Sequence, residues 1–396
     1  MKELSRIVKG VHASSTMAID ALYKQMQADG LDVIGFAAGE PDFPTPAHIK
    51  EAGIQAIQDN YTKYTPASGM LDLKKAACER LKADCGVEYQ PNQVVVASGA
   101  KHALYLTLRA LINPGDEVIL PTPAWVSYYE LILICGGVPV MLSAAEEQGF
   151  KITPEQLEEA VTDKTKAIIL NNPSNPTGML YNKAQLQAIT DVCVKHDLYI
   201  VADEIYYGLI YDNKPFTSIP SLGEEVKKRT ILINGVSKSY AMTGWRIGYA
   251  LAEPDLAKMM SNYVSHSTGS PCAVSQKASI VGLTASQDEV RAMRDAFQAR
   301  RDYMVDAMNK IPGVSCICPE GAFYVMMNVQ QIIGKTIGGV LIDSAQTFAT
   351  EFLKQGHVAV VPGEGFSAPG FVRWSYAVSL DNIKEGLRRL EKFIHM

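Results

Sequence analysis

The stretch VVVASGAKHALYLTLRALI, residues 94–112, changes from a short apolar run to a segment with helical periodicity. Four consecutive apolar residues, 94–97, are typical of a buried strand. In residues 101–112, Ala103, Leu104, Leu108 and Leu111 recur at helical spacing, and the sequence NPGD at 113–116 ends the helix. A buried strand followed directly by a helix is the repeating unit of an α/β fold.

The same alternation continues along the chain. Strand-like apolar runs occur at 118–120, 138–140, 167–170, 199–202 and 231–233, and a helical pattern covers 183–196. We therefore expect an α/β protein with a largely parallel, doubly wound sheet. The pattern changes after about residue 285. A long charged helix at 287–310, strands at 322–328 and 358–361, and a final helix at 380–394 predict a second, smaller α+β domain.

Composition and charge exclude several classes of protein. The 396 residues include 37 Lys and Arg against 42 Asp and Glu, and this net charge of −5 argues against a broad nucleic-acid-binding surface. The N-terminal sequence has no apolar core of signal-peptide length, and the apolar stretch 131–145 is too short to span a bilayer. We expect a soluble, cytoplasmic protein with no membrane contact. The seven scattered cysteines and seven histidines show no metal-ligand spacing, so we expect reduced thiols and no metal.

Ligands of a doubly wound sheet bind beyond the carboxyl ends of its strands, and polar residues follow several strands here. The helix that begins near Ser98 offers unpaired N–H groups to a phosphate, although this segment taken alone favours a plain Ser98 N-cap. The Asn-rich turn at 171–178 presents amides in fixed positions or is only a tight turn. Asp203 ends an apolar strand and needs a cationic partner there. Lys238, among small and apolar residues, is either an amine nucleophile of lowered pKa or one half of an ion pair, and Arg246 could bind an anion.

Seven motifs extend this pattern over nearly the whole chain. They are GEPDF (39–43), KYTP (63–66), NPSNPTG (172–178), DEIY (203–206), SKSYAMTGWRIGY (237–249), GAFY (321–324) and VRWSY (372–376). In this order they resemble the class I and II aminotransferases that use pyridoxal 5′-phosphate, the family of aspartate aminotransferase, and most of all its bacterial branch. The resemblance implies a fold-type I transferase. Its large domain, at 48–285, would contain a mostly parallel seven-stranded sheet, and its small domain would combine the N-terminal arm, 1–47, with 286–396.

The resemblance also assigns roles to residues. Lys238 would form the Schiff base with the cofactor aldehyde and move a proton from the substrate α-carbon, and Asp203 would keep the pyridine nitrogen protonated. Tyr206 and Asn175 would hydrogen-bond the phenolic oxygen, and Trp125 would stack on the ring. The phosphate would be held by Gly99, Ala100, Ser237, Arg246 and, from the neighbouring subunit of a homodimer, Tyr64.

For the substrate, the resemblance implies that Arg373 binds the α-carboxylate in a bidentate fork, assisted by the Gly39 backbone and bordered by Trp125 and Asn175. Two departures from the animal enzymes follow. The segment 266–271 lacks the arginine that reads a distal carboxylate, and Lys101 and Thr16 stand where the bacterial branch places a lysine and a threonine instead. Gly235 stands where some members bring a hydroxyl to the phosphate.

The function implied is a ping-pong aminotransferase, with L-aspartate as donor and 2-oxoglutarate as acceptor. An aromatic or broad-range aminotransferase and a carbon–sulfur β-lyase of the same fold are the alternatives. A cofactor-binding regulator is disfavoured because the family pattern starts within the first 40 residues, which leaves no room for a preceding DNA-binding module. A catalytically dead binding protein is disfavoured because Lys238, Asp203 and Arg373 are all present. The sequence GEGFSA at 363–368 loosely fits a dinucleotide fingerprint, but Pro369 and Gly370 break the helix that must follow.

Overall fold

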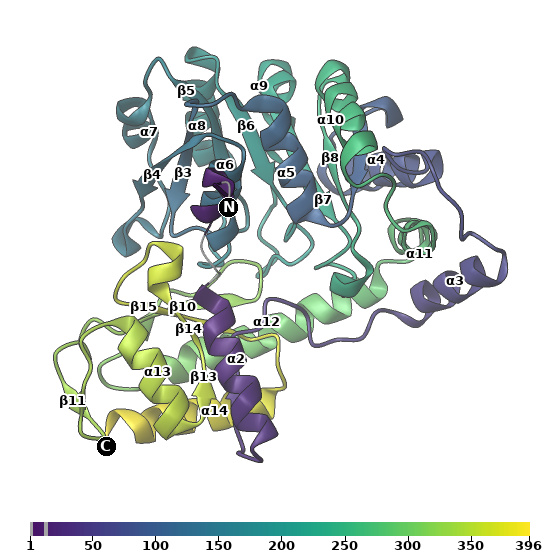
Figure 1. The fold of residues 1–396 in the computed structure, drawn as a ribbon. Coiled ribbons are helices and arrows are strands. Elements are labelled where there is room, and N and C mark those ends of the chain that lie inside the picture. The colour runs from purple at the N-terminus through teal and green to yellow at the C-terminus, as the bar shows by residue number, and fades with distance from the viewer. Residues whose placement is uncertain (1–2, 12–14) are drawn as a thin grey trace.

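The computed structural model describes residues 3–11 and 15–396, and its centre is a seven-stranded sheet (Figure 1). The strand order is β2-β8-β7-β6-β5-β3-β4, and only β8 runs antiparallel to its neighbours. This confirms the mostly parallel seven-stranded sheet. Its strands are β2 (Val94–Ala97), β3 (Glu117–Thr122), β4 (Val138–Ser143), β5 (Thr165–Asn171), β6 (Tyr199–Asp203), β7 (Thr230–Gly235) and β8 (Gly248–Leu251).

Helices cover both faces of this sheet, because its central strands are apolar on both sides. Val95 and Ala97 of β2 belong to one apolar cluster, whereas Val94 and Val96 belong to another, as the alternation of side chains along a strand requires. The first cluster includes side chains of α5 (Ala100–Leu111), α6 (Val126–Ile134) and α10 (Pro254–Ser267). The second includes side chains of α3 (Ala47–Gln58), α4 (Leu71–Cys85), α7 (Pro154–Ala160), α8 (Lys183–Lys195), α9 (Glu224–Arg229) and α11 (Ala273–Thr284).

A second, smaller layer lies against the sheet's lower edge in Figure 1. Its sheet has the order β14-β15-β10-β9, with β9 (Ser315–Cys316), β10 (Tyr324–Asn328), β14 (Val361–Pro362) and β15 (Phe371–Ser375). The helices α13 (Ala345–Gly356) and α14 (Leu380–Ile394) pack against it, and α12 (Asp288–Met308) runs along the junction of the two layers. A short hairpin, β11 (Thr336–Ile337) and β12 (Val340–Leu341), completes this part.

The N-terminal segment joins the smaller layer. β1 (Ile34–Gly35) pairs in parallel with β13 (Val358–Ala359), and α2 (Ser15–Ala28) contributes Ile19 and Met26 to a small apolar cluster with Leu353 of α13. The short α1 (Arg6–Lys9) lies beside α6 in Figure 1. The division into 48–285 and 1–47 with 286–396 stays a prediction.

Two local predictions need correction, and one strand was missed. The strand expected at 358–361 is two strands in different sheets, since β13 pairs with β1 and β14 pairs with β15. The strand expected from 322 begins at Tyr324, because Ala322 has a φ of 59° and cannot extend the strand. The antiparallel β8 has the sequence GYAL and was not predicted from its short, glycine-led apolar pattern.

The described residues also bear on metals, membranes and thiols. Within 3–11 and 15–396, no group of three or more His, Cys, Asp or Glu side chains could hold a metal ion. Across the same ranges, every helix is too short or too polar to cross a lipid bilayer. All seven cysteines are free thiols.

Candidate active site

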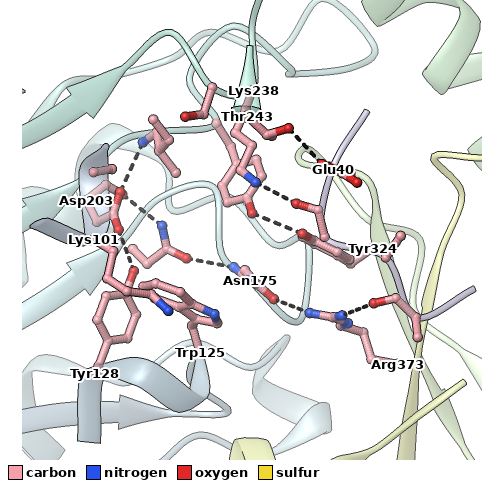
Figure 2. A pocket seen from close by; sticks show the side chains of 18 of the residues that line it. Glu40, Lys101, Trp125, Tyr128, Asn175, Asp203, Lys238, Thr243, Tyr324 and Arg373 are labelled. Atoms are coloured by element: carbon pink, nitrogen blue, oxygen red, sulfur yellow. Dashed lines mark hydrogen bonds between the residues drawn. The ribbon is translucent and has the colours of Figure 1, made fainter. Parts of the chain in front are cut away.

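A cavity of about 530 Å³ opens at the carboxyl ends of the parallel strands, between the large sheet and the smaller layer (Figure 2). Asn171 ends β5, Asp203 ends β6, and the loops after β3 and β7 bring in Trp125 and Lys238. The residues that line it are Lys24, Ala37, Ala38, Gly39, Glu40, Ala100, Lys101, Trp125, Tyr128, Asn171, Asn175, Asp203, Ile205, Tyr206, Ser237, Lys238, Thr243, Arg246, Tyr324 and Arg373.

One end of the cavity is built for an anion. Gly99 is the N-cap of α5, with a φ of 90° and no side-chain cap, so Ser98 is not the N-cap. A Cβ at Gly99 would meet Arg246 Nη2 at 2.3 Å, so the glycine is what allows the guanidinium to approach the helix N-terminus. Within the part of the chain that the structure describes, Arg246 donates to two backbone oxygens, those of Thr243 at 2.8 Å and Ser98 at 3.3 Å, and to no side chain. A guanidinium beside uncapped N–H groups fits a phosphate.

Asp203 is a buried carboxylate that points into the middle of the cavity. Its Oδ2 accepts a hydrogen bond of 2.7 Å from the hydroxyl of Tyr128, and its Oδ1 accepts one of 3.2 Å from the Ile205 N–H (Figure 2). Burial raises the pKa of Asp203 to about 6, and these hydrogen bonds and the Lys238 charge counteract part of that rise. The carboxylate therefore fits the protonated nitrogen of a pyridine ring, because a positive charge there would offset its burial.

Lys238 lies half-buried on the other side of the cavity. Its Nζ donates to the Gly39 backbone oxygen at 2.5 Å, and the Tyr206 and Phe323 rings flank it at 5.8 and 5.9 Å. Burial lowers the pKa of Lys238 to about 8, although Glu40 acts in the opposite direction. An amine that loses its proton near pH 8 can act as a nucleophile and as a proton carrier.

Arg373 and Asn175 form a second cationic end. Arg373 donates to Asn175 Oδ1 at 3.0 Å and to the Ala37 oxygen at 2.9 Å, and its guanidinium lies 4.4 Å from the Tyr324 ring centroid (Figure 2). Its Nε is buried without a hydrogen-bond partner among the described residues. Because no carboxylate of the described chain satisfies this arginine, the site fits the carboxylate of a substrate.

Trp125 and Lys101 border the opposite wall. Lys101 Nζ lies 4.9 Å from the centroid of the Trp125 ring, and Trp125 packs edge-on against Tyr128. The protein around Lys101 and the nearby Arg246 both lower its pKa, which indicates a site that favours an anion beside these two cations.

Most predicted site residues thus meet in one cavity; two described ones, Gly99 and Tyr64, do not line it. Gly99 acts from just behind the wall through its contact with Arg246. Tyr64 is fully exposed and lies outside the cavity. Thr16 lies in the first turn of α2, and its side chain is outside what the structure describes.

Packing explains why Gly235 stands where some members of the family bring a hydroxyl to the phosphate. A Cβ there would meet Gly248 Cα at 2.8 Å and the Ile247 oxygen at 2.9 Å. The close approach of β7 and β8 therefore requires glycine, and a hydroxyl side chain has no room at this position.

Sequence reasoning missed four contributors to the site. Tyr128 bonds Asp203, Tyr324 bonds Tyr206, and Thr243 donates to Glu40 at 2.7 Å. Two of these residues lie within motifs that carried the family resemblance, Tyr324 in GAFY and Glu40 in GEPDF. The sequence analysis assigned neither of them a role. Tyr128 lies one helical turn after Trp125 and carries no local signal of its own.

The comparisons with known proteins agree with this site. The family model for aminotransferase class I and II matches residues 31–390. The aspartate aminotransferase of Bacillus sp. (strain YM-2) is 47% identical, with 100% of both chains covered. The aspartate/prephenate aminotransferase of Cereibacter sphaeroides is 44% identical, with 99% of both covered. The crystal structure of the aspartate aminotransferase of Rhizobium meliloti has a TM-score of 0.96 at 39% identity, covering 100% of this chain and 99% of that one.

The residues at hand also fit the cofactor of that family. The Arg246 and α5 end suits a phosphate, Asp203 suits a pyridinium nitrogen, and Lys238 suits an aldehyde. The chain belongs to the class I and II aminotransferases, enzymes that use pyridoxal 5′-phosphate.

Proposed function

We propose that this enzyme transfers the amino group of L-aspartate to 2-oxoglutarate in two half-reactions at one site. The observation that carries the proposal is that two cations besides Arg246 line the same cavity. Arg373 lies at one wall and Lys101 lies beside Trp125 at another, with the Lys238 amine between the elements that hold them. A dicarboxylate can pair one carboxylate with Arg373 and the other with Lys101, whereas a monocarboxylate leaves one of these two cations unpaired.

When bound, pyridoxal phosphate supplies an electron-withdrawing ring that takes up the electron pair released at the substrate α-carbon. Asp203 holds a proton on the ring nitrogen, and Tyr128 keeps that carboxylate ionised and oriented. Lys238 would hold the cofactor through its aldehyde and, as a free amine, would take the proton from the substrate α-carbon. Its lowered pKa supports this role because a neutral amine is required for the first transfer.

Substrate orientation follows from Arg373. Its two donating nitrogens already lie in one plane, held by Asn175 and the Ala37 oxygen, so they are pre-organised for a carboxylate. Trp125 supplies an apolar face on the other side of the cavity and keeps water from the reacting atoms. Lys101 and Thr16 would together receive the distal carboxylate of aspartate.

We also propose that two copies of the chain form the working enzyme. Tyr64 is fully exposed, and Ile54, Ile57 and Leu71, close to it in the sequence, expose more than half of their surface. A second copy packed on these side chains would bury them and would let Tyr64 reach the partner's phosphate site. The unpaired state of all seven thiols supports a cytoplasmic location, where thiols stay reduced.

The test is a comparison of kcat/KM for aspartate and phenylalanine, with 2-oxoglutarate as acceptor, in wild type and Lys101→Gln. We expect wild type to prefer aspartate and the substitution to lower kcat/KM for aspartate about 30-fold or more, with little change for phenylalanine. Lys164→Gln, at an exposed position away from the cavity, is the control. An equal loss for both donors, or a wild-type preference for phenylalanine, would overturn the dicarboxylate proposal. Pyruvate and ammonia released from cystathionine would instead favour the β-lyase.

A further inference from the structure

Tyr324 lies between the two parts of the site that handle substrate and cofactor, and nothing above gives it a role. It begins β10 and is almost fully buried, at 1% exposure. Its hydroxyl lies 3.1 Å from the hydroxyl of Tyr206, and its ring lies under the Arg373 guanidinium at 4.4 Å (Figure 2).

The sheet register explains why these contacts are fixed. In the antiparallel pair of β10 and β15, Tyr324 faces Ser375 and Met326 faces Arg373. Residues two apart on a strand share a face, so Tyr324 and Arg373 are diagonal neighbours on the same face of this small sheet. The ring of Tyr206 packs edge-on against that of Tyr324, with centroids 5.9 Å apart. The contact therefore joins the small sheet to the loop after β6.

Only one direction of the hydrogen bond between the Tyr324 and Tyr206 hydroxyls leaves Tyr206 able to donate to a cofactor. A hydroxyl carries a single proton, so Tyr206 can donate to a cofactor oxygen only if Tyr324 is the donor in their mutual hydrogen bond. A hydroxyl that accepts a hydrogen bond becomes a stronger donor itself. The Arg373 charge over the Tyr324 ring makes Tyr324 a stronger donor in turn, because it draws electron density from the phenol.

We propose that Tyr324 is a positioning residue that couples the substrate-carboxylate site at Arg373 to the donor strength of Tyr206 at the cofactor. A carboxylate bound at Arg373 partly neutralises the guanidinium, weakens its effect on Tyr324 and so weakens the hydrogen bond from Tyr206. This inference rests on the proposed function, since it needs a cofactor oxygen at Tyr206 and a substrate carboxylate at Arg373.

The test uses the holoenzyme and the pH midpoint at which the visible absorbance of the bound cofactor changes. The measurement is made without ligand and with succinate, a dicarboxylate that has no amino group to transfer. Besides Tyr324, the titratable and charged groups around Tyr206 and Lys238 are Tyr128, Asp203, Glu40, Arg246 and Arg373, and Tyr324→Phe leaves all of these in place. The substitution also keeps the ring under Arg373 and removes only the hydroxyl.

We expect the ligand-free midpoint of Tyr324→Phe to rise by about 0.5 pH unit, because a weaker Tyr206 donor stabilises the deprotonated cofactor less. We also expect succinate to move that midpoint less than it moves the wild-type midpoint. In a Tyr206→Phe background, Tyr324→Phe should have no further effect on the midpoint, since the acceptor of its hydrogen bond is gone.

Tyr181→Phe is the matched control. Tyr181 is also a buried tyrosine, and its hydroxyl accepts from the Ile152 N–H, away from the cavity. An unchanged midpoint in Tyr324→Phe, an equal change in Tyr181→Phe, or an effect that persists in the Tyr206→Phe background would each overturn the inference. A wild-type protein that shows no visible cofactor band would instead contradict the proposed function, so the two failures are distinguishable.

Discussion

The Lys238 ammonium is expected to destabilise the cofactor-free protein, and this can be measured. Its pKa falls from 10.5 to about 8 because it is buried. That difference of about 2.5 pH units, at about 1.4 kcal/mol each, corresponds to about 3.5 kcal/mol of lost stability below pH 8. Lys238→Met removes the charge at similar length but also loses the hydrogen bond to the Gly39 oxygen, which contributes about 1 kcal/mol. The cofactor-free variant should therefore be about 2.5 kcal/mol more stable at pH 7.

The lowered pKa of Lys238 also predicts how the free energy of unfolding changes with pH. Between about pH 8 and 10.5 the unfolded chain still binds a proton that folded Lys238 has released, so the stability of the wild type rises with pH across this window. The advantage of Lys238→Met should therefore be full at pH 7 and lost near pH 10.5, where the variant should be about 1 kcal/mol less stable than wild type because only the loss of the hydrogen bond remains. At pH 7 the advantage corresponds to a rise in Tm of about 3 °C for a chain of this length.

The assay is urea and thermal unfolding of the cofactor-free proteins at one protein concentration, followed by tryptophan fluorescence at pH 7 and pH 10.5. Lys164→Met, an exposed lysine outside the cavity, is the control and should change stability little at either pH. A Lys238→Met variant that is no more stable than wild type at pH 7, or whose gain is the same at both pH values, would refute the reasoning.

Three further predictions concern the walls of the cavity. Gly99→Ala should weaken cofactor affinity at least tenfold by equilibrium dialysis, because its Cβ would strike Arg246, whereas Gly86→Ala, with open space around its Cβ, should leave it unchanged. Arg373→Lys should lower kcat/KM for aspartate about 100-fold, because one ammonium cannot replace a bidentate fork; an unchanged value would refute its role. Tyr128→Phe should raise the pH below which cofactor affinity is lost by about one unit, because it removes a hydrogen bond that keeps Asp203 ionised; an unshifted profile would contradict this.

Much of the fold was predictable because the strands are buried on both faces. Runs such as 94–97 and 199–202 are continuously apolar, and each was found within a residue of its observed bounds. The final helix was predicted at its observed ends because its apolar stripe is strongly periodic and Ser379 caps it. The two-residue strands β1 and β13 have no periodicity to recognise, since pairing across more than 300 residues of sequence creates them.

Some residues of the candidate site were also predictable from the sequence, and others were not. The sequence motifs allowed the roles of three residues to be predicted, namely Lys238, Asp203 and Arg373. The structure places these residues around one cavity. The contacts that tune them were not predictable. Tyr128 reaches Asp203 from a different strand–helix unit, and Tyr324 reaches Tyr206 from the smaller sheet. Such pairs depend on the packing of distant segments, which local pattern does not encode.

The most direct test of the central claim is an absorption spectrum of the purified protein loaded with pyridoxal phosphate, before and after L-aspartate is added without any oxo acid. The account predicts that aspartate converts the visible band of the bound cofactor to the near-ultraviolet band of its aminated form, that oxaloacetate appears in equal amount, and that Lys238→Met shows no such turnover. Conversion by phenylalanine but not aspartate would contradict the role given to Lys101. A protein that never binds the cofactor through Lys238 would contradict the account as a whole.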